Sequence, residues 1–206
     1  LIWEPVSYTK KPFSLSRKAN IPIHILNTNH PEDPGTIIQE RTNIKNPYAI
    51  TGIAGKEGFV SIYIYKKHMS SEVGYIRKVL SILEMYNVSV EHIPSGIDSF
   101  SVVVNKSDVQ DSLYEILARI KTELKPDEIH TEENLALIST VGKSMSDSPG
   151  VAGKLFKSLG DQKINIRMIA QSSDEINITV AVLCKDFKAT IRSIYDAFVT
   201  KEDQNV

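Results

Sequence analysis

The sequence predicts an α+β fold made of two similar units, each with helices on one face of an antiparallel sheet. Two observations support this prediction: the chain repeats itself at a fixed offset, and each copy alternates β-rich segments with helical periodicity in the order β-α-β-β-α. A length of 206 residues, with 41% hydrophobic and 24% charged residues, suits two small domains with cores of their own.

The repeat has an offset of 76 positions, which places Gly74 on Gly150, Lys78 on Lys154 and Leu83 on Leu159. We expect this offset to hold without a gap from the first strand of each copy through the third. The other matched pairs are apolar: Val88 with Ile164, Ile93 with Ile169, Phe100 with Ile176, and Val102 with Ile178.

The first copy is expected to end in a helix over Asp108–Leu124, capped by Ser107 or Asp108 and closed before Pro126. One more strand should complete the unit. The earlier elements are a strand at Phe59–Ile64, a helix at Tyr75–Met85, a strand at Asn87–Ile93, a turn at Ser95–Asp98 and a strand at Ser99–Val104.

The second copy is predicted to have strands at Leu135–Val141, Ile164–Ile169 and Ile176–Leu183, and helices at Val151–Leu159 and Phe187–Phe198. A leftover strand at Ala49–Ala54 has no counterpart before the second copy, where residues 129–133 stand instead. We expect that strand to complete the second unit, which would make the first unit an insertion. The predicted domains are residues 1–44, then 56–126 for the first unit, 45–55 plus 127–200 for the second, and a tail at 201–206.

Composition excludes several classes of function. A net charge of −1 gives no basic surface for nucleic acid or anionic lipid. The single cysteine, Cys184, belongs to the run Asn177–Cys184, which is typical of a buried strand, so a packed thiol in the cytoplasm is expected. No apolar stretch is long enough to span a membrane, and no signal peptide is recognisable. The histidines lack metal-ligand spacing, and no glycine-rich phosphate loop occurs, so no metal and no catalytic residue is expected in this chain alone.

Several motifs occur in order along the chain: Ala19–Ile23, Asn27–Thr28 and Pro34–Thr36; Glu91–Asp98 in the first copy; and Val141–Met145, Ser148–Val151, Ile164–Ile169, Ser172–Ser173 and Glu175–Ile178 in the second. The motifs of the two copies resemble the C-terminal regulatory region of aspartate kinases, which carries tandem ACT modules of the ferredoxin-like βαββαβ type. The three earliest motifs resemble the end of the kinase domain. Residues 1–18 match no part of this family, and its nucleotide-binding segment is absent.

The resemblance implies that the parent protein uses ATP and Mg to phosphorylate L-aspartate to 4-phospho-L-aspartate. Its ACT modules would form a homodimer, contact the kinase domain and bind an end product of lysine, threonine and methionine biosynthesis. Lysine is the preferred effector and threonine the second choice. The alternatives are a dimerisation module without ligand, or an ACT pair from another amino-acid enzyme.

The resemblance also places the effector between the turn before a helix in one module and the second strand of a paired module. A helix N-terminus attracts a carboxylate, and Glu91 stands where a carboxylate would hold a basic effector. The expected effector-binding residues are Met69, Glu72, Val73, Gly74, Tyr75, Ile76, Ser89, Val90, Glu91, Ser95 and Asp98.

Several of these residues also have a purely structural interpretation. Gly74 and Gly150 suit ordinary turns, Val73, Tyr75, Ile76 and Val90 suit a core, and Glu91 and Asp98 suit a solvated surface. In the second module, Ser172–Ser173 and Asp147–Ser148 would form either a second pocket or a simple turn, and Asp147 suits a helix entry.

Overall fold

The computed structural model describes residues 19, 21–39, 49–142, 145–146 and 148–199, in two units that divide at residues 47 and 48. Residues 1–18, the tail at 201–206 and the expected helix entry at Asp147 lie outside the described residues. The first unit contains a hairpin of β1 (Ile23–Ile25) and β2 (Thr36–Ile38), which pair antiparallel.

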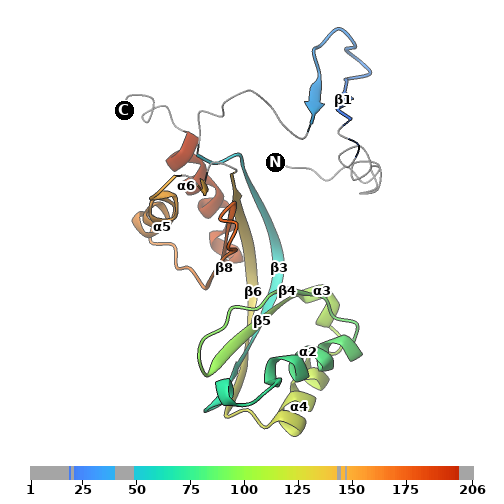
Figure 1. The fold of residues 1–206 in the computed structure, drawn as a ribbon, viewed down its shortest axis with the longest axis vertical. Coiled ribbons are helices and arrows are strands. Elements are labelled where there is room, and N and C mark those ends of the chain that lie inside the picture. Colours follow the sequence, from blue (N-terminus) through green and yellow to red (C-terminus); the bar gives the residue numbers. More distant parts are fainter. Residues whose placement is uncertain (1–18, 20, 40–48, 143–144, 147, 200–206) are drawn as a thin grey trace. The chain divides into compact units, whose positions relative to one another are not determined.

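The second unit is built on one six-stranded antiparallel sheet with the strand order β4-β5-β3-β6-β8-β7. Figure 1 shows α2 and α4 at one end of the β3–β6 pair and α5 and α6 at the other. The strands are β3 (Gly52–Tyr65), β4 (Val90–His92), β5 (Ser99–Asn105), β6 (Glu128–Val141), β7 (Met168–Gln171) and β8 (Asn177–Leu183). The helices are η1 (Met69–Ser71), α2 (Tyr75–Met85), α3 (Lys106–Val109), α4 (Leu113–Leu124), α5 (Val151–Asp161), η3 (Cys184–Asp186) and α6 (Phe187–Val199).

The two long central strands, β3 and β6, run through both halves of this sheet. The start of β3 pairs with the end of β6 (Gly52 opposite Val141), and the end of β3 pairs with the start of β6 (Tyr65 opposite Glu128). The register shifts midway, beside Gly58 (φ 92°) in β3 and Asn134 (φ 58°) in β6. A bulge adds one residue to its strand, so the alternation of side chains between the two faces changes at these points.

Three clusters of apolar side chains hold the second unit together. The first core lies between α2, α4 and one half of the sheet, with Ile62, Leu83 and Ile116 at its centre. The second lies between α5, α6 and the other half, with Ile138 and Leu155 fully buried. Burial of large apolar side chains on this scale is the main stabilising contribution to such a fold.

The third cluster comes from the sheet face that points away from the helices. Its members are Phe59, Val103, Leu135, Leu137, Met168 and Ala181. Val103, for example, lies between Val102 and Val104, which face the first core, and side chains alternate along a strand. Five strands from both halves contribute to this cluster, so it joins the two halves. An ion pair between Glu132 and Arg167, with 3.3 Å between Oε1 and Nε, adds a second connection.

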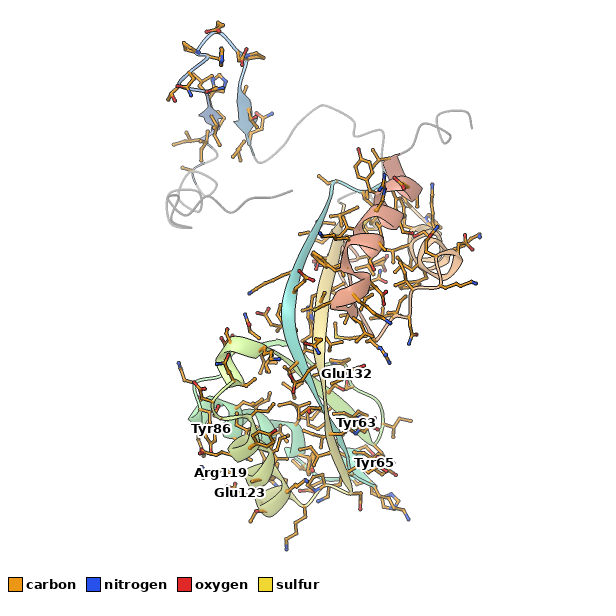
Figure 2. All side chains as sticks on the ribbon, turned by 180° about the vertical axis from the view of Figure 1, so that it is seen from behind. Tyr63, Tyr65, Tyr86, Arg119, Glu123 and Glu132 are labelled. Carbon is orange, nitrogen blue, oxygen red and sulfur yellow. The ribbon has the colours of Figure 1, made fainter. Side chains whose placement is uncertain are left out.

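Helix α2 is also linked to α4 by polar contacts beside the first core. Arg119 of α4 forms an ion pair with Glu123, with 2.5 Å between Nε and Oε1, and its guanidinium also donates to the hydroxyl of Tyr86 at the end of α2 (Figure 2). The hydrogen bonds to Glu123 and Tyr86 raise the pKa of Arg119, so this arginine stays charged. These contacts hold the C-terminal end of α2 in place.

The predicted α+β class, the antiparallel sheet and the order of elements are confirmed. The single helix expected over Asp108–Leu124 is wrong, because the chain forms α3 and α4 with a break between them. The cap is Asn105, whose side chain accepts a hydrogen bond from the backbone N–H of Ser107 at 3.2 Å. Asp111 and Ser112 stand at the break, and such side chains favour helix ends over helix interiors.

Residues 129–133, which we did not expect to form a strand, belong to β6 and supply the final strand of the first core. The prediction that the offset of 76 holds through the third strand of each copy is also wrong. Helices α2 and α5 are 76 positions apart, but β5 and β8 are 78 apart. The second copy therefore has two more residues between Ile164 and β8 than the first copy has between Val88 and β5. Because side chains alternate with a period of two, a shift of two leaves the apolar pattern unchanged, and the sequence could not reveal it.

Strand pairing places residues 52–56 beside residues 137–141, next to β8. Ile50 and Ile53 pack in the second core, whereas Ile129 packs against the first. The domain boundaries at residues 55 and 126 stay a prediction. The strand β3 runs across the first of these boundaries without interruption.

Candidate functional site

The turn before α2 holds the first six predicted effector residues. The chain forms the short helix η1, and Gly74 then caps α2 with a left-handed backbone (φ 76°). A residue with a side chain adopts this conformation only at a cost, which explains the glycine. Met69 and Tyr75 are buried in the first core and Ile76 packs against it, whereas Val73 is 95% exposed.

Glu72 forms two ion pairs in this turn. Its carboxylate accepts from Lys66 Nζ at 3.1 Å and from Lys78 Nζ at 3.0 Å. Lys66 also donates to the carbonyl of Leu124 at 2.9 Å, so the pair connects the turn to the end of α4. The hydrogen bonds from Lys78 and Lys66 lower the pKa of Glu72. In this structure the carboxylate of Glu72 is therefore engaged within the turn itself.

Tyr75, the first residue of α2, packs its buried side chain next to the same turn. Its ring packs edge-on against Phe100, and Lys66 Nζ lies 5.0 Å from its ring centroid. Its hydroxyl is buried and has no hydrogen-bond partner in the described part of the chain. Burial raises the pKa of Tyr75 to about 12, with smaller contributions from Glu72 and Asp127. Tyr75 is therefore a neutral packing residue.

Replacing Glu72 by glutamine removes the charge that both lysines contact, and we expect a lower melting temperature at neutral pH. The folded-state pKa of Glu72 is depressed, so its contribution is present above the ordinary value of 4.5 and is lost as the pH falls through the lower folded value. The difference between wild type and Glu72→Gln should therefore shrink below pH 4.5 and in high salt. Thermal melting at several pH values measures it.

Glu57→Gln is the matched control for this experiment, because Glu57 is an exposed glutamate on β3, away from any helix end. It should change the melting temperature little at any pH. A difference for Glu72→Gln that is the same at pH 3 and pH 7 would contradict the role of its charge.

A groove of about 810 Å³ lies between the outer side of α2 and the edge strand β4. It contains three of the predicted residues, Ser89, Val90 and Glu91, together with residues that the sequence did not single out. Its walls are Arg77, Leu80, Ser81 and Glu84 of α2 and residues 87–93.

Residues 69–76 of the turn do not line this groove. Arg77, which lines the groove, also lies close to this turn, because its Nε would be 3.6 Å from a Cβ atom added to Gly74. Ser95 and Asp98 lie in the turn between β4 and β5, where the carbonyl of Asp98 accepts a hydrogen bond from the Lys66 N–H at 2.9 Å. Asp98 thus lies near the turn before α2, and Ser95 forms a bridge to Phe100.

Sequence reasoning missed Arg77 and Glu84 as candidate binding residues. Their seven-residue spacing on one helix was visible, and it places them on the same side of α2. Nothing in the sequence alone showed that this side faces β4 rather than open solvent.

The second half has a smaller cavity of about 300 Å³ at the start of α5, next to Gly150 (φ 92°). Ser148, Gln171 and Glu175 contribute polar atoms to its wall. Ser172 does not line it; its hydroxyl donates to Asp174 and its carbonyl accepts from the Glu175 N–H at 3.0 Å. The turn interpretation of Ser172 is thus the one that its contacts support.

Within the described residues, no cluster of histidine, cysteine, aspartate and glutamate side chains could hold a metal ion. The same part of the chain contains no helix that could cross a membrane.

Comparison with known proteins identifies the family. A family model for the ACT domain matches residues 138–198. Aspartokinase 3 of Bacillus subtilis is 35% identical over 183 residues, which are 88% of this chain and 40% of that protein. The crystal structure of Clostridium acetobutylicum aspartate kinase is 45% identical, with a TM-score of 0.87, over 93% of this chain and 45% of that one. This chain is homologous to the regulatory region of aspartokinases.

A third similarity shows which part of an aspartokinase the chain matches. The regulatory subunit of Thermus thermophilus aspartate kinase, in a ligand-free form, is 27% identical with a TM-score of 0.64. The match covers 74% of this chain and 99% of that subunit. The chain spans less than half of the two longer aspartokinases. The predicted ACT fold and the resemblance to the aspartokinase regulatory region are confirmed.

Proposed function

We propose that this chain is the effector-sensing part of an aspartate kinase, a protein that transfers phosphate from ATP to L-aspartate and forms 4-phospho-L-aspartate. The observation that carries the proposal is the coverage of the relatives: the chain includes nearly all of a free-standing regulatory subunit and under half of complete kinases. Binding of ATP and Mg would belong to the kinase domain, outside this chain. The expected cytoplasmic location stays part of the proposal.

Lysine is the proposed effector, with threonine as the second choice. Glu91 is exposed on the edge strand β4 and lines the groove, where a carboxylate can meet an ammonium group. E. coli aspartokinase III, which shares the fold at 22% identity and a TM-score of 0.72, was solved in complex with lysine and aspartate. That similarity concerns the fold alone, so the charge of Glu91 is the main support from this chain.

We propose the eleven predicted residues as the effector-binding residues, and a pair of chains could bring them together. Residues 69–76 lie outside the groove that contains residues 89–91, so the two sets would meet only across a pair of copies. Strand β4 lies at the edge of the sheet, where its free backbone groups can pair with a second chain. A homodimer would then place the turn of one copy over the strand of the other.

Regulation requires that the effector prefer one of two arrangements of the protein. A coupling of about 1–3 kcal/mol between the effector site and the kinase domain is typical of such control. Inserting the first module (56–126) into the second (45–55 plus 127–200) would help to transmit this preference, because β3 and β6 belong to both halves.

Calorimetric titration of the chain with lysine and with threonine tests the proposal. We expect lysine to bind and to raise the melting temperature. Glu91→Gln should weaken lysine about tenfold or more, because it removes a charged partner of the ammonium group. Glu115→Gln, an exposed glutamate away from the groove, should leave the affinity unchanged.

The opposite results separate the alternatives. No heat and no thermal shift with either amino acid at millimolar concentration would contradict effector sensing. A dimer whose melting temperature ignores every amino acid would instead favour a pure dimerisation module.

A further inference from the structure

The half of the second unit that contains α2 and α4, here called the first half, is linked along the chain to the N-terminal unit only through the other half. The chain enters the first half along β3 and leaves it along β6, and both strands also run through the second half. The start of β3, which follows the N-terminal unit, pairs with the end of β6 in the second half. A change in the first half therefore reaches the N-terminal unit along the chain only by way of the second half.

The short segment before β3 is fixed to the second half. Ile50 is buried in the second core, and the N–H of Thr51 donates a hydrogen bond to the carbonyl of Val141 at 2.6 Å. The backbone of this segment also lies against Gly142, where an added Cβ atom would be 2.5 Å from the carbonyl oxygen of Ala49. The segment must therefore move with the second half.

Backbone pairing between β3 and β6 is interrupted where the two halves meet. Among the residues that the structure describes in these strands, Gly58 and Val60 of β3 and Glu133 and Asn134 of β6 have no Cα partner in the other strand. A pair of strands with an interrupted ladder bends and twists more easily than a continuous one. Side-chain contacts must therefore fix the angle between the halves.

Two side-chain contacts join the halves at this place. The third apolar cluster contains Val103 from the first half and Met168 from the second, both buried. Glu132 of the first half pairs with Arg167, whose N–H donates to the carbonyl of Ala181 on β8 at 2.8 Å. Figure 2 shows Glu132 near the middle of the β3–β6 pair. Closely packed side chains cannot shift without opening voids, so these contacts make the joint stiff.

We infer that this joint makes the two halves one rigid body, so that the second half carries a change in the first half to the segment before β3. Glu132, Arg167 and Met168 act as positioning residues, because they fix the angle between the halves and do not line the groove between α2 and β4. The final step, from this segment to the kinase domain, rests on the proposed function. The rigid joint does not rest on it, so the two are tested separately.

Distance measurements between two spin labels test the joint in the full chain. The labels are attached through Glu115→Cys on α4 and Arg192→Cys on α6, both exposed positions, with Cys184→Ser to remove the single natural thiol. Met168→Ala and Ile164→Ala are then compared in this background. Both side chains are 8% exposed, but Met168 belongs to the shared cluster and Ile164 to the second core alone.

We expect one narrow distance distribution for the labelled parent chain and for Ile164→Ala, and a broader distribution or a second peak for Met168→Ala. Equal distributions for the two variants would overturn the rigid joint.

Glu132→Gln is a second variant that removes the ion pair without creating a cavity, and it decides the question if Met168→Ala does not fold. It should broaden the distribution. Glu133→Gln is its matched control, because Glu133 pairs with Lys106 of the first half and should leave the distribution unchanged. Equal distributions for these two variants would likewise contradict the joint.

Inhibition of the kinase that contains this chain tests the final step. The Met168→Ala chain should bind lysine in calorimetry as tightly as wild type. At saturating lysine the variant kinase should nevertheless keep at least about fivefold more activity than wild type, because coupling between sites usually amounts to that factor or more. Ile164→Ala should be inhibited as wild type is. A change in stability alone would not separate binding from inhibition in this way.

The outcomes for the joint and for the proposed function are distinct. Full inhibition of Met168→Ala together with a broadened distance distribution would overturn transmission through the second half. If the wild-type chain binds neither lysine nor threonine, the proposed function fails and the final step fails with it, while the distance measurement still decides the rigid joint.

Discussion

Phe59→Ala is expected to lower the free energy of unfolding by about 3–5 kcal/mol, the usual cost of removing a buried aromatic ring. Phe59 is only 2% exposed and belongs to the cluster that joins the two halves of the sheet. Its partner across the strands is Leu135, the residue 76 positions further along. Domains of this size have a free energy of unfolding of about 5–15 kcal/mol, so the loss would be a large share of the total stability.

Chemical denaturation measures this effect, with two controls. Phe59→Leu should cost less than half as much, because it keeps an apolar side chain at a position where the second copy already has leucine. Ile97→Ala, at an 80% exposed position, should change the free energy by no more than about 0.5 kcal/mol. A loss below 1 kcal/mol for Phe59→Ala would mean that the shared cluster does not hold the halves together.

Gly142→Ala is expected to lower the free energy of unfolding by about 1–3 kcal/mol, the range for overpacking a tight site. A Cβ atom at this position would lie 2.5 Å from the carbonyl oxygen of Ala49 and 2.9 Å from the Cα of Ile50. Both contacts are with backbone atoms, so no side-chain rotation can relieve them. The substitution would push residues 49–50, which belong to the second core, away from the end of β6.

Gly52→Ala is the matched control for this prediction. Gly52 starts β3 opposite Val141, one residue before Gly142, yet no atom lies within 4 Å of an added Cβ. Its free energy of unfolding should change by no more than about 0.5 kcal/mol. Equal losses for both glycines would show that the close approach of residues 49–50 to Gly142 does not matter in solution.

Much of the fold could be predicted because local signals and periodicity agree. The helix Tyr75–Met85 has the predicted bounds, since Gly74 and the apolar spacing both mark its start. The repeat is visible in backbone conformation as well: Gly58 and Asn134, Gly74 and Gly150, and Asn87 and Lys163 are each 76 apart, and all have positive φ.

The errors arose where the residues carry no local signal. Residues 129–133 contain four charged or polar side chains, so they did not suggest a strand, yet pairing with β3 extends β6 through them. The break between α3 and α4 depends on how the chain packs over β3 and β5. Propensity is a weak guide where tertiary contacts decide.

By itself the sequence determined the α+β class, the two copies and the family, and it singled out three residues that line the groove, Ser89, Val90 and Glu91. These features depend on residue types at fixed spacings, which are readable without coordinates. Only the tertiary structure decided that β3 and β6 serve both halves, that Glu72 is held by two lysines, and that Arg77 and Glu84 line one groove with Glu91. Each of these depends on residues far apart in sequence, or on which side of a helix meets a strand, and no local pattern encodes such distances.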